Sequence, residues 1–435
     1  METNSILIKN VDWVVTQNSK RDILKNTSVY IEDNKIMEIG KPRIEADFVI
    51  NGKNKILLPG LINCHTHSPM TLLRGYSDDK KLEDWWFKDI YPVESKFRPK
   101  HVYWGSLLAC LEMIKFGCTY FIDFYYFLDK IAKATLESGI RCNLGQGILD
   151  FKTFEFPKKK IAFMIAKRMI RKWRKKDRIN VSIAPHMFQT TSPDTYAECA
   201  DIAKKYNIIL QSHVAESKTE IDFATNTYGK RPVDLLETSG CLFESAVAIH
   251  CNWLNMKEIE KFSNYGVSVV HCPVSNMKLG ENRIMPLNDM LKHNVKVSLG
   301  TDGCASNNNL DLFEEMKVFS LLHKSYLNDP TVAPVQKVLD MATVDAAEIL
   351  HEDDLGSIEI GKKADLILID TKKPHLQPIH GKHTVLSNLV YSAKGQDVDD
   401  VICDGKVLMK DRKILTLDET KIIGKASKLI SDLLS

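Results

Sequence analysis

Eight short segments rich in β-branched and aliphatic residues alternate with longer amphipathic segments through the middle of this 435-residue chain. Such alternation is typical of βα units that build a parallel sheet. Eight units are enough to close a (β/α)8 barrel of the TIM type, which is the α/β fold that we predict. The short segments lie at residues 61–63, 120–123, 141–144, 181–184, 208–211, 246–249, 267–270 and 295–299.

Polar side chains follow most of these segments at the point where the predicted strand ends. They are His65, His67, Asp123, His186, His213, His250, His271 and Asp302. A barrel carries its chemistry on the rim formed by the carboxyl ends of its strands, so this placement favours the barrel. An open, doubly wound sheet is the competing topology, but the sequence has no G-x-G-x-x-G or Walker-type phosphate motif.

Both ends of the chain have a different sequence pattern, in which short strand-like segments are separated by Asn, Asp, Lys and Gly. These strands are expected at residues 6–8, 14–15, 28–31, 364–369, 401–403 and 406–409. Asp404-Gly405 is a typical two-residue hairpin turn between the last two of them. We therefore predict a small β-sandwich domain built from residues 1–57 and 363–435, and a catalytic barrel built from residues 58–362.

The charge balance excludes a strongly basic or acidic protein, because 59 Lys and Arg stand against 56 Asp and Glu. Neither nucleic acid nor a membrane is expected as a partner on this ground.

Residues 158–178 are locally basic, but Ile161, Ile165, Met169 and Trp173 recur at i+4 spacing. We expect an amphipathic helix outside the barrel with this apolar stripe facing inward; lipid or nucleic-acid binding by its basic face is the alternative.

The ten cysteines include no C-x-x-C pair, so we expect buried free thiols in a reducing cytoplasm. The first four residues, Met1 to Asn4, lack the basic start of a secretion signal, and no apolar run reaches roughly 18 residues. A cytoplasmic location without membrane contact is the prediction.

A metal site is predicted at the carboxyl ends of the strands. His65 and His67 lie two residues apart, so on a strand both imidazoles share one face and can reach one ion. His213 and His250 end further strands, and Asp302 follows the last one. Three of these imidazoles together with the carboxylate form a ligand set that suits Zn²⁺ and leaves one coordination position open for water. Fe²⁺ and Mn²⁺ are the alternative metals. Each histidine alone would be read as a hydrogen-bonded structural residue.

The stretch PGLINCHTH at residues 59–67 resembles the first strand of the amidohydrolase superfamily. Four more stretches look like its methylthioadenosine/S-adenosylhomocysteine deaminase branch, in which the archaeal 5'-deoxyadenosine deaminases are most similar. They are MTLLRG at 70–75, SHVAES at 212–217, SNMKLG at 275–280 and LGTDGCASNN at 299–308. The resemblance extends over almost the whole chain.

The resemblance implies a role for each matching position. It implies metal ligands at His65, His67, His213 and Asp302, catalytic residues at Glu216, His250 and Asp302, and substrate-binding residues at Glu94, His186, Glu216 and Asp302. Glu216 would shuttle protons, and His250 would orient the attacking water. Members with two metal ions use a lysine on the fourth strand, which this chain lacks, so one Zn²⁺ per subunit is implied.

The implied function is metal-dependent hydrolytic deamination of adenosine-type nucleosides, such as 5'-deoxyadenosine, 5'-methylthioadenosine, S-adenosylhomocysteine and adenosine, to the inosine analogue and ammonia. A homo-oligomer, dimer or tetramer, is expected. Gln146 stands where relatives that take S-adenosylhomocysteine have arginine, and it cannot grip a carboxylate in the same bidentate way. This departure favours a compact 5'-substituent.

Three questions stay open at this point. A guanine or cytosine deaminase, or a triazine chlorohydrolase, would use the same metal chemistry on another ring. A non-catalytic barrel protein is the alternative from a different class, since a fold alone does not define a function. Trp85 and Trp86 could cover the site or only pack beneath the loop after the first strand.

Overall fold

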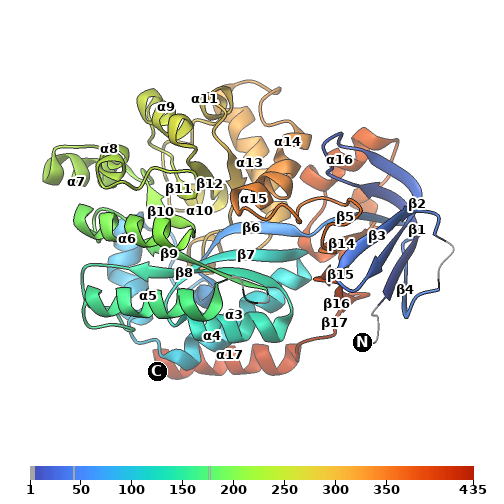
Figure 1. Ribbon diagram of the computed structural model, residues 1–435, viewed down its shortest axis with the longest axis horizontal. Helices are drawn as coiled ribbons and strands as arrows, with labels where there is room; N and C mark the ends of the chain where they lie inside the picture. Colours follow the sequence, from blue (N-terminus) through green and yellow to red (C-terminus); the bar gives the residue numbers. More distant parts are fainter. Residues whose placement is uncertain (1–4, 43–44, 175, 177) are drawn as a thin grey trace.

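The computed structural model describes residues 5–42, 45–174, 176 and 178–435, and its centre is an eight-stranded parallel barrel (Figure 1). The strands pair in chain order, each with the next, which is the arrangement predicted from the eight short segments. They are β6 (Leu61–Thr66), β7 (Cys118–Tyr125), β8 (Arg141–Ile148), β9 (Ile179–Pro185), β10 (Leu210–Val214), β11 (Ala246–His250), β12 (Ser268–His271) and β13 (Val297–Leu299).

The last strand returns to the first at the end where the polar residues lie. The backbone N–H of Asp302, just after β13, donates to the carbonyl of His65 on β6 over 3.0 Å. This bond brings the two ends of the strand series together. It also places residues 237 positions apart in sequence on one side of the rim.

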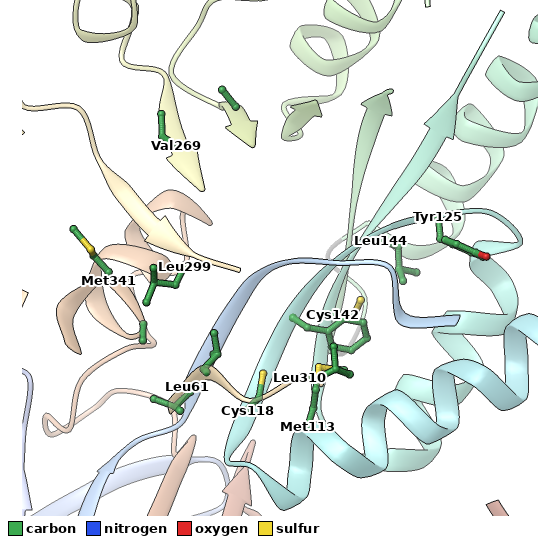
Figure 2. Packing of buried hydrophobic residues seen from close by; sticks show 14 of the residues in the cluster. Leu61, Met113, Cys118, Tyr125, Cys142, Leu144, Val269, Leu299, Leu310 and Met341 are labelled. Carbon is green, nitrogen blue, oxygen red and sulfur yellow. The ribbon is translucent and has the colours of Figure 1, made fainter. Parts of the chain in front are cut away.

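Alternate residues of the strands pack into two different hydrophobic clusters, as the two-residue period of a strand requires. Tyr120, Ile122 and Phe124 of β7 face the barrel interior, where Ile62 and Val270 also lie. The intervening side chains pack outward against the helices. Figure 2 shows part of this outer cluster, including Leu61, Met113, Cys118, Tyr125, Cys142, Leu144, Val269, Leu299, Leu310 and Met341.

Helices surround the barrel and connect its strands (Figure 1). None of those in the described part of the chain is long and apolar enough to span a membrane. The longer helices are α3 (Pro99–Lys115), α4 (Leu128–Ser138), α5 (Lys159–Trp173), α6 (Pro193–Tyr206), α7 (Lys218–Tyr228), α9 (Met256–Tyr265), α13 (Leu312–Leu327), α16 (Lys382–Tyr391) and α17 (Glu419–Leu434). Shorter helices are α1 (Leu82–Asp84), α2 (Tyr91–Glu94), α8 (Pro232–Thr238), α10 (Pro273–Lys278), α11 (Leu287–Lys292), α12 (Cys304–Asn307), α14 (Val335–Met341) and α15 (Val344–Ile349).

Helix α5 forms where the basic amphipathic helix was predicted, but its buried face differs in detail. Ile161 is 37% exposed, whereas Met169 is buried as expected. Because four residues turn about 40° past one full helical turn, a strict i+4 row drifts around the helix. The buried face is instead made by Ala162, Phe163, Ala166, Met169 and Ile170.

Both chain ends contribute to a second sheet of nine strands. They are β1 (Ser5–Val15), β2 (Ile23–Glu32), β3 (Lys35–Gly40), β4 (Phe48–Asn51), β5 (Lys55–Pro59), β14 (Leu366–Asp370), β15 (Val398–Cys403), β16 (Lys406–Lys410) and β17 (Lys413–Ile414). The pairing of β5 with β14 joins the N-terminal and C-terminal parts. The hairpin predicted at Asp404-Gly405 is confirmed, and both residues have the positive φ that its turn needs.

Two segments expected as separate strands, residues 6–8 and 14–15, belong to one strand, β1. Asn10 between them has a φ of 58°, and the register with β2 shifts between Ile8 and Val11. The asparagine that suggested a turn instead forms a bulge, a role for which its tolerance of the left-handed conformation suits it.

Candidate active site

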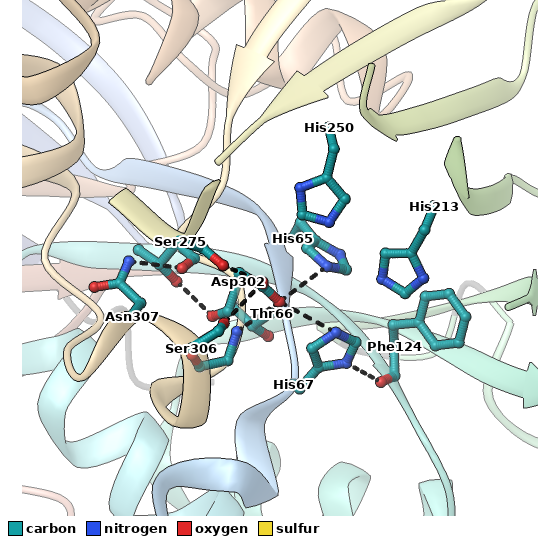
Figure 3. Close-up of polar contacts among 12 residues, drawn as sticks. His65, Thr66, His67, Phe124, His213, His250, Ser275, Asp302, Ser306 and Asn307 are labelled. Carbon is teal, nitrogen blue, oxygen red and sulfur yellow. Dashed lines mark hydrogen bonds and ion pairs between the residues drawn. The ribbon is translucent and has the colours of Figure 1, made fainter. Parts of the chain in front are cut away.

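Three histidines from two strands meet at the carboxyl end of the barrel (Figure 3). His65 lies on β6, His67 directly follows it, and His213 lies on β10. One nitrogen atom from each lies within 4.8 Å of the others, and the ring centroids are 4.8 to 5.5 Å apart. The histidines that the sequence placed on separate strands therefore form one compact group of potential ligands.

The ring nitrogens are arranged as metal ligands require. The Nδ1 atom of His67 lies 2.7 Å from the carbonyl oxygen of Phe124, so a proton on Nδ1 leaves the Nε2 lone pair facing the group. Neither nitrogen of the fully buried His65 has a hydrogen-bond partner. Burial lowers the pKa of His213 well below its usual value, so its ring is neutral. Imidazole nitrogens that converge on one point in this way fit a divalent metal ion.

Asp302 joins this group from the loop after β13. Its Oδ1 atom lies 3.4 Å from Nε2 of His65 and 3.2 Å from Nε2 of His67. Its Oδ2 atom accepts hydrogen bonds from the hydroxyls of Ser275 at 2.7 Å and Ser306 at 2.8 Å (Figure 3). The two serines hold the carboxylate so that Oδ1 faces the histidines. Four of the predicted site residues thus converge.

Glu216 and His250 lie beside this group and contact each other. The Nε2 atom of His250 is 3.5 Å from Oε1 of Glu216. Burial, reinforced by the negative charge of Asp302, raises the pKa of Glu216 well above its usual value, which favours the protonated carboxyl. Burial lowers the pKa of His250 to about 3, so that ring is neutral. The pair can therefore exchange a proton or a hydrogen bond with a ligand in the cavity.

The backbone is strained at two of these residues. His250 has a φ of 72° and Asp302 a φ of 61°, although neither is glycine. Non-glycine residues enter this region at an energetic cost, and such strain concentrates at functional sites. The local sequence gives no sign of it, and it aims both side chains toward the histidines.

A cavity opens over this group, with about 810 Å³ of empty volume that includes open solvent at its mouth. Glu94 and His186, predicted to bind substrate, both line it, together with His67, His213, Glu216, His250 and Asp302. Burial raises the pKa of Glu94 to about 7. Among the described residues, no lysine or arginine lines the cavity.

The two tryptophans left open by the sequence have different environments. Trp86 lines the cavity and stacks on His186, with ring centroids 5.0 Å apart and planes 27° apart. Trp85 is 6% exposed, and its Nε1–H donates to the carbonyl of Ser77 over 3.1 Å. Both tryptophans therefore line the cavity, Trp86 by stacking on His186 and Trp85 from a mostly buried position anchored to the loop.

Gln146 is not among the described residues that line the cavity. Its side chain is fully buried, and its Nε2 atom donates to Oε2 of Glu155 over 2.9 Å. The residue thus bonds to the loop after β8, and neither Gln146 nor Glu155 is among the described residues that line the cavity.

Sequence reasoning missed several residues that position the site. Ser275 and Ser306 hold Asp302, and the side-chain amide of Asn276 lies 3.1 Å from Nδ1 of His250. All three lie within the stretches at residues 275–280 and 299–308 that carried the family resemblance. Their presence there was the available signal, because short polar side chains clustered beside a predicted ligand often orient it.

Residues 56–408 match the amidohydrolase family, and the chain belongs to that family. It is a hydrolytic enzyme, and members of the family are typically metal-dependent.

Two relatives are similar over their whole length. The 5'-deoxyadenosine deaminase of Methanosarcina mazei is 44% identical over 433 residues, which cover 99% of this chain and 98% of the relative. The 5-methylthioadenosine/S-adenosylhomocysteine deaminase of Dictyoglomus turgidum is 42% identical over 433 residues, with 99% of each chain covered. An adenosine deaminase from Xanthomonas campestris, solved with bound zinc, has the same fold with a TM-score of 0.95 and 32% identity, and 99% of each chain is covered.

Proposed function

We propose that this enzyme hydrolyses the 6-amino group of adenosine-type nucleosides, releasing the inosine analogue and ammonia. Candidate substrates are 5'-deoxyadenosine, 5'-methylthioadenosine, S-adenosylhomocysteine and adenosine. The observation that carries the proposal is the geometry of the site: Oε1 of Glu216 lies 3.5 Å from Nε2 of His250, in the cavity beside which His65, His67 and His213 converge. Full-length relatives with deaminase names support the same reaction.

One Zn²⁺ per subunit is the proposed metal, with Fe²⁺ or Mn²⁺ as alternatives. His65, His67, His213 and Asp302 would hold it, since their nitrogen atoms and Oδ1 of Asp302 lie close to one another. When bound, such an ion lowers the pKa of water to about 7, which supplies a nucleophile at neutral pH.

Glu216 is proposed as the general acid. Attack on C6 of the purine places negative charge on the ring, and the proton of the Glu216 carboxyl neutralises this charge at N1. The Glu216 carboxylate then takes the remaining proton of the attacking water and passes it to the departing amine, and the proton held by Asp302 restores the carboxyl. A general acid of this kind contributes about 10²- to 10⁴-fold to the rate. His250, neutral and in contact with Glu216, orients the attacking water, and Asp302 accepts the proton that this water releases.

Glu94 and His186 are proposed to bind the nucleoside. Both line the cavity, and Glu94 is 3% exposed, so its oxygens are available to ligand hydroxyls rather than to bulk water. The absence of a lysine or arginine among the described lining residues leaves a carboxylate tail without a cationic partner. A compact, uncharged 5'-substituent is therefore favoured over the tail of S-adenosylhomocysteine.

The proposed domain division is residues 1–57 with 363–435, and residues 58–362. Two domains are supported by the separate hydrogen bonding of the two sheets, but β5 of the second sheet continues to Pro59, two residues past the proposed boundary, and β6 begins at Leu61. A homo-oligomer, dimer or tetramer, stays a prediction. A cytoplasmic location also stays a prediction, supported by ten cysteines that are all free and buried.

The direct test is ammonia release from a substrate panel, run on protein whose metal content has been measured. The four adenosine-type nucleosides should give ammonia and their inosine analogues, with 5'-deoxyadenosine ahead of S-adenosylhomocysteine in kcat/KM. Guanine, cytosine and a chlorotriazine are the comparison substrates. Turnover of one of these without turnover of any adenosine analogue would replace the proposal by the related amidohydrolase activity.

A further inference from the structure

A second cavity, of about 1460 Å³, lies at the opposite end of the barrel from the active site. On β9, Ile179 to Val181 at the start of the strand line this cavity, whereas His186, just past the end of the strand, lines the active site. We call it the basal cavity. Its polar lining residues are Tyr120, Arg141, Asn143, Arg174, Arg178, Asn180, Asn207, Glu244, Ser245, His351, Glu352 and Lys363.

Two of the four cationic side chains in the basal cavity are already neutralised. Arg141 is 5% exposed and forms hydrogen bonds of 2.8 and 3.1 Å with Asp365 and of 2.7 Å with Asp404. The Nζ atom of Lys363 lies 3.6 Å from Oε2 of Glu352. These pairs fix the boundary between the barrel and the second sheet, and they leave no charge for a ligand.

The other two cations, Arg174 and Arg178, are less fully paired with the carboxylates that the structure describes. Within the described part of the chain, Arg174 forms no ion pair and no side-chain hydrogen bond. Arg178 is 14% exposed at its side chain, and its one ion pair is a 3.7 Å contact with Asp404, which Arg141 already binds at 2.7 Å. The Nε atoms of both arginines are buried and have no hydrogen-bond partner. The remaining lining carboxylate, Glu244, pairs with neither.

Buried Nε–H donors without partners, as at these two half-buried arginines, are unusual, because a buried donor that has lost water is normally satisfied by an acceptor. The planar guanidinium fork matches the oxygens of a phosphate group, and two such forks together can neutralise its double charge. A phosphate between Arg174 and Arg178 would satisfy both Nε atoms and the charge at once.

A further unpartnered group points to an organic ligand rather than to phosphate alone. Asn143, on β8, is 4% exposed, and its Oδ1 atom is buried without a hydrogen-bond partner. It lines the same cavity as the two arginines. An amide oxygen accepts hydrogen bonds from hydroxyl groups, such as those of a sugar. The volume of the cavity also exceeds what one phosphate fills.

From these contacts we infer that the basal cavity is a second ligand site, which binds a phosphate-bearing small molecule through Arg174 and Arg178, with Asn143 contacting its hydroxyl groups. The site is independent of the deaminase proposal, because none of its residues lines the active-site cavity.

Isothermal titration of the purified, metal-loaded protein at low ionic strength tests this inference. The probes are inorganic phosphate and ribose 5-phosphate, which lacks the purine that the active site would take. We expect a Kd of about 1 mM or tighter for at least one probe. Tighter binding of ribose 5-phosphate would identify an organic phosphate as the ligand type, and equal binding would identify phosphate itself.

The variant R174Q/R178Q should weaken binding about tenfold or more, because it removes two charged donors. The matched control is R168Q/R171Q, which removes the same charge from exposed positions of α5 and should bind like the wild type. If R174Q/R178Q does not fold, R174K serves instead, since it keeps the charge but loses the fork and should also bind more weakly. No heat with either probe, or an equal loss in both double variants, would overturn the inference.

Discussion

The side-chain amide of Asn276 lies 3.1 Å from Nδ1 of His250, on the side of the ring that faces away from Glu216. When the amide donates this hydrogen bond, Nδ1 is the acceptor and the ring proton sits on Nε2. That proton then faces the Oε1 atom of Glu216 at 3.5 Å. Asn276 therefore determines which tautomer His250 presents to the cavity.

Replacing Asn276 by alanine should lower kcat about 10- to 100-fold, the usual effect of losing an orienting partner, with little change in metal content. N276D should lose at least as much, because a carboxylate accepts from Nδ1 and so removes the proton from Nε2. Steady-state kinetics and metal analysis on both variants check this. N309A, which removes an exposed amide bound to Glu314, is the control. If the kcat of N276A equals that of the wild type, Asn276 does not determine the tautomer of His250.

Glu216→Gln should leave metal content near normal and reduce kcat by about two to four orders of magnitude, because the amide cannot deliver a proton. The side chain keeps its size and its place beside His250, so folding should be unaffected. Single-turnover measurements on the metal-loaded variant would show the loss in the chemical step. Turnover within a factor of about three of the wild type would remove Glu216 from the mechanism.

His67→Ala should lower metal occupancy and activity together, since it removes one of three imidazoles that meet within 4.8 Å. Metal content per subunit and kcat, measured on the same preparation, should fall in parallel, and added Zn²⁺ should restore part of the activity. His293→Ala is the control, because that ring bonds the Asp289 carbonyl on α11 far from the site. Full metal content in H67A would mean that the ion lies elsewhere.

Glu220 gives a prediction for stability against pH. It is buried, and burial raises its pKa from 4.5 to about 7. The folded protein therefore holds this proton between pH 4.5 and 7 while the unfolded chain releases it, so stability falls as pH rises through that window. The lost free energy of unfolding is on the order of 3 kcal/mol.

Glu220→Gln should remove this loss, because the amide oxygen can still accept from the backbone N–H of Glu216 and carries no charge to bury. Urea unfolding from pH 4.5 to 8 should show that the free energy of unfolding of E220Q increases relative to that of the wild type as pH rises. Glu260→Gln, at an exposed position of α9, is the control, and its free energy of unfolding should depend on pH in the same way as that of the wild type. A constant difference between E220Q and the wild type across this range would disprove the raised pKa.

The parts of the fold that depend on local pattern could be predicted from the sequence. Eight short apolar segments became eight strands, and the residues at their ends met on one rim because parallel strands all point their carboxyl ends the same way. His65, His67, His213 and Asp302 needed no more than this rule to be brought together.

Features that depend on non-local packing could not be predicted. The bulge at Asn10 depends on pairing with β2, and the buried face of α5 depends on how the helix rotates against β8 and β9. The positive φ of His250 and Asp302 exists only because the surrounding contacts impose it. Asn276 reaches His250 across 26 positions of sequence, a pairing that no periodicity indicates.

The central claim is that His65, His67, His213 and Asp302 hold one divalent ion beside Glu216. A crystal structure of the enzyme purified with its metal, with anomalous differences collected on both sides of the zinc absorption edge, tests it most directly. The account predicts a single strong peak per subunit within about 2.0 to 2.2 Å of the ligand atoms of these four residues. A peak at any other position, or metal-loaded active crystals with no peak among these side chains, would contradict it.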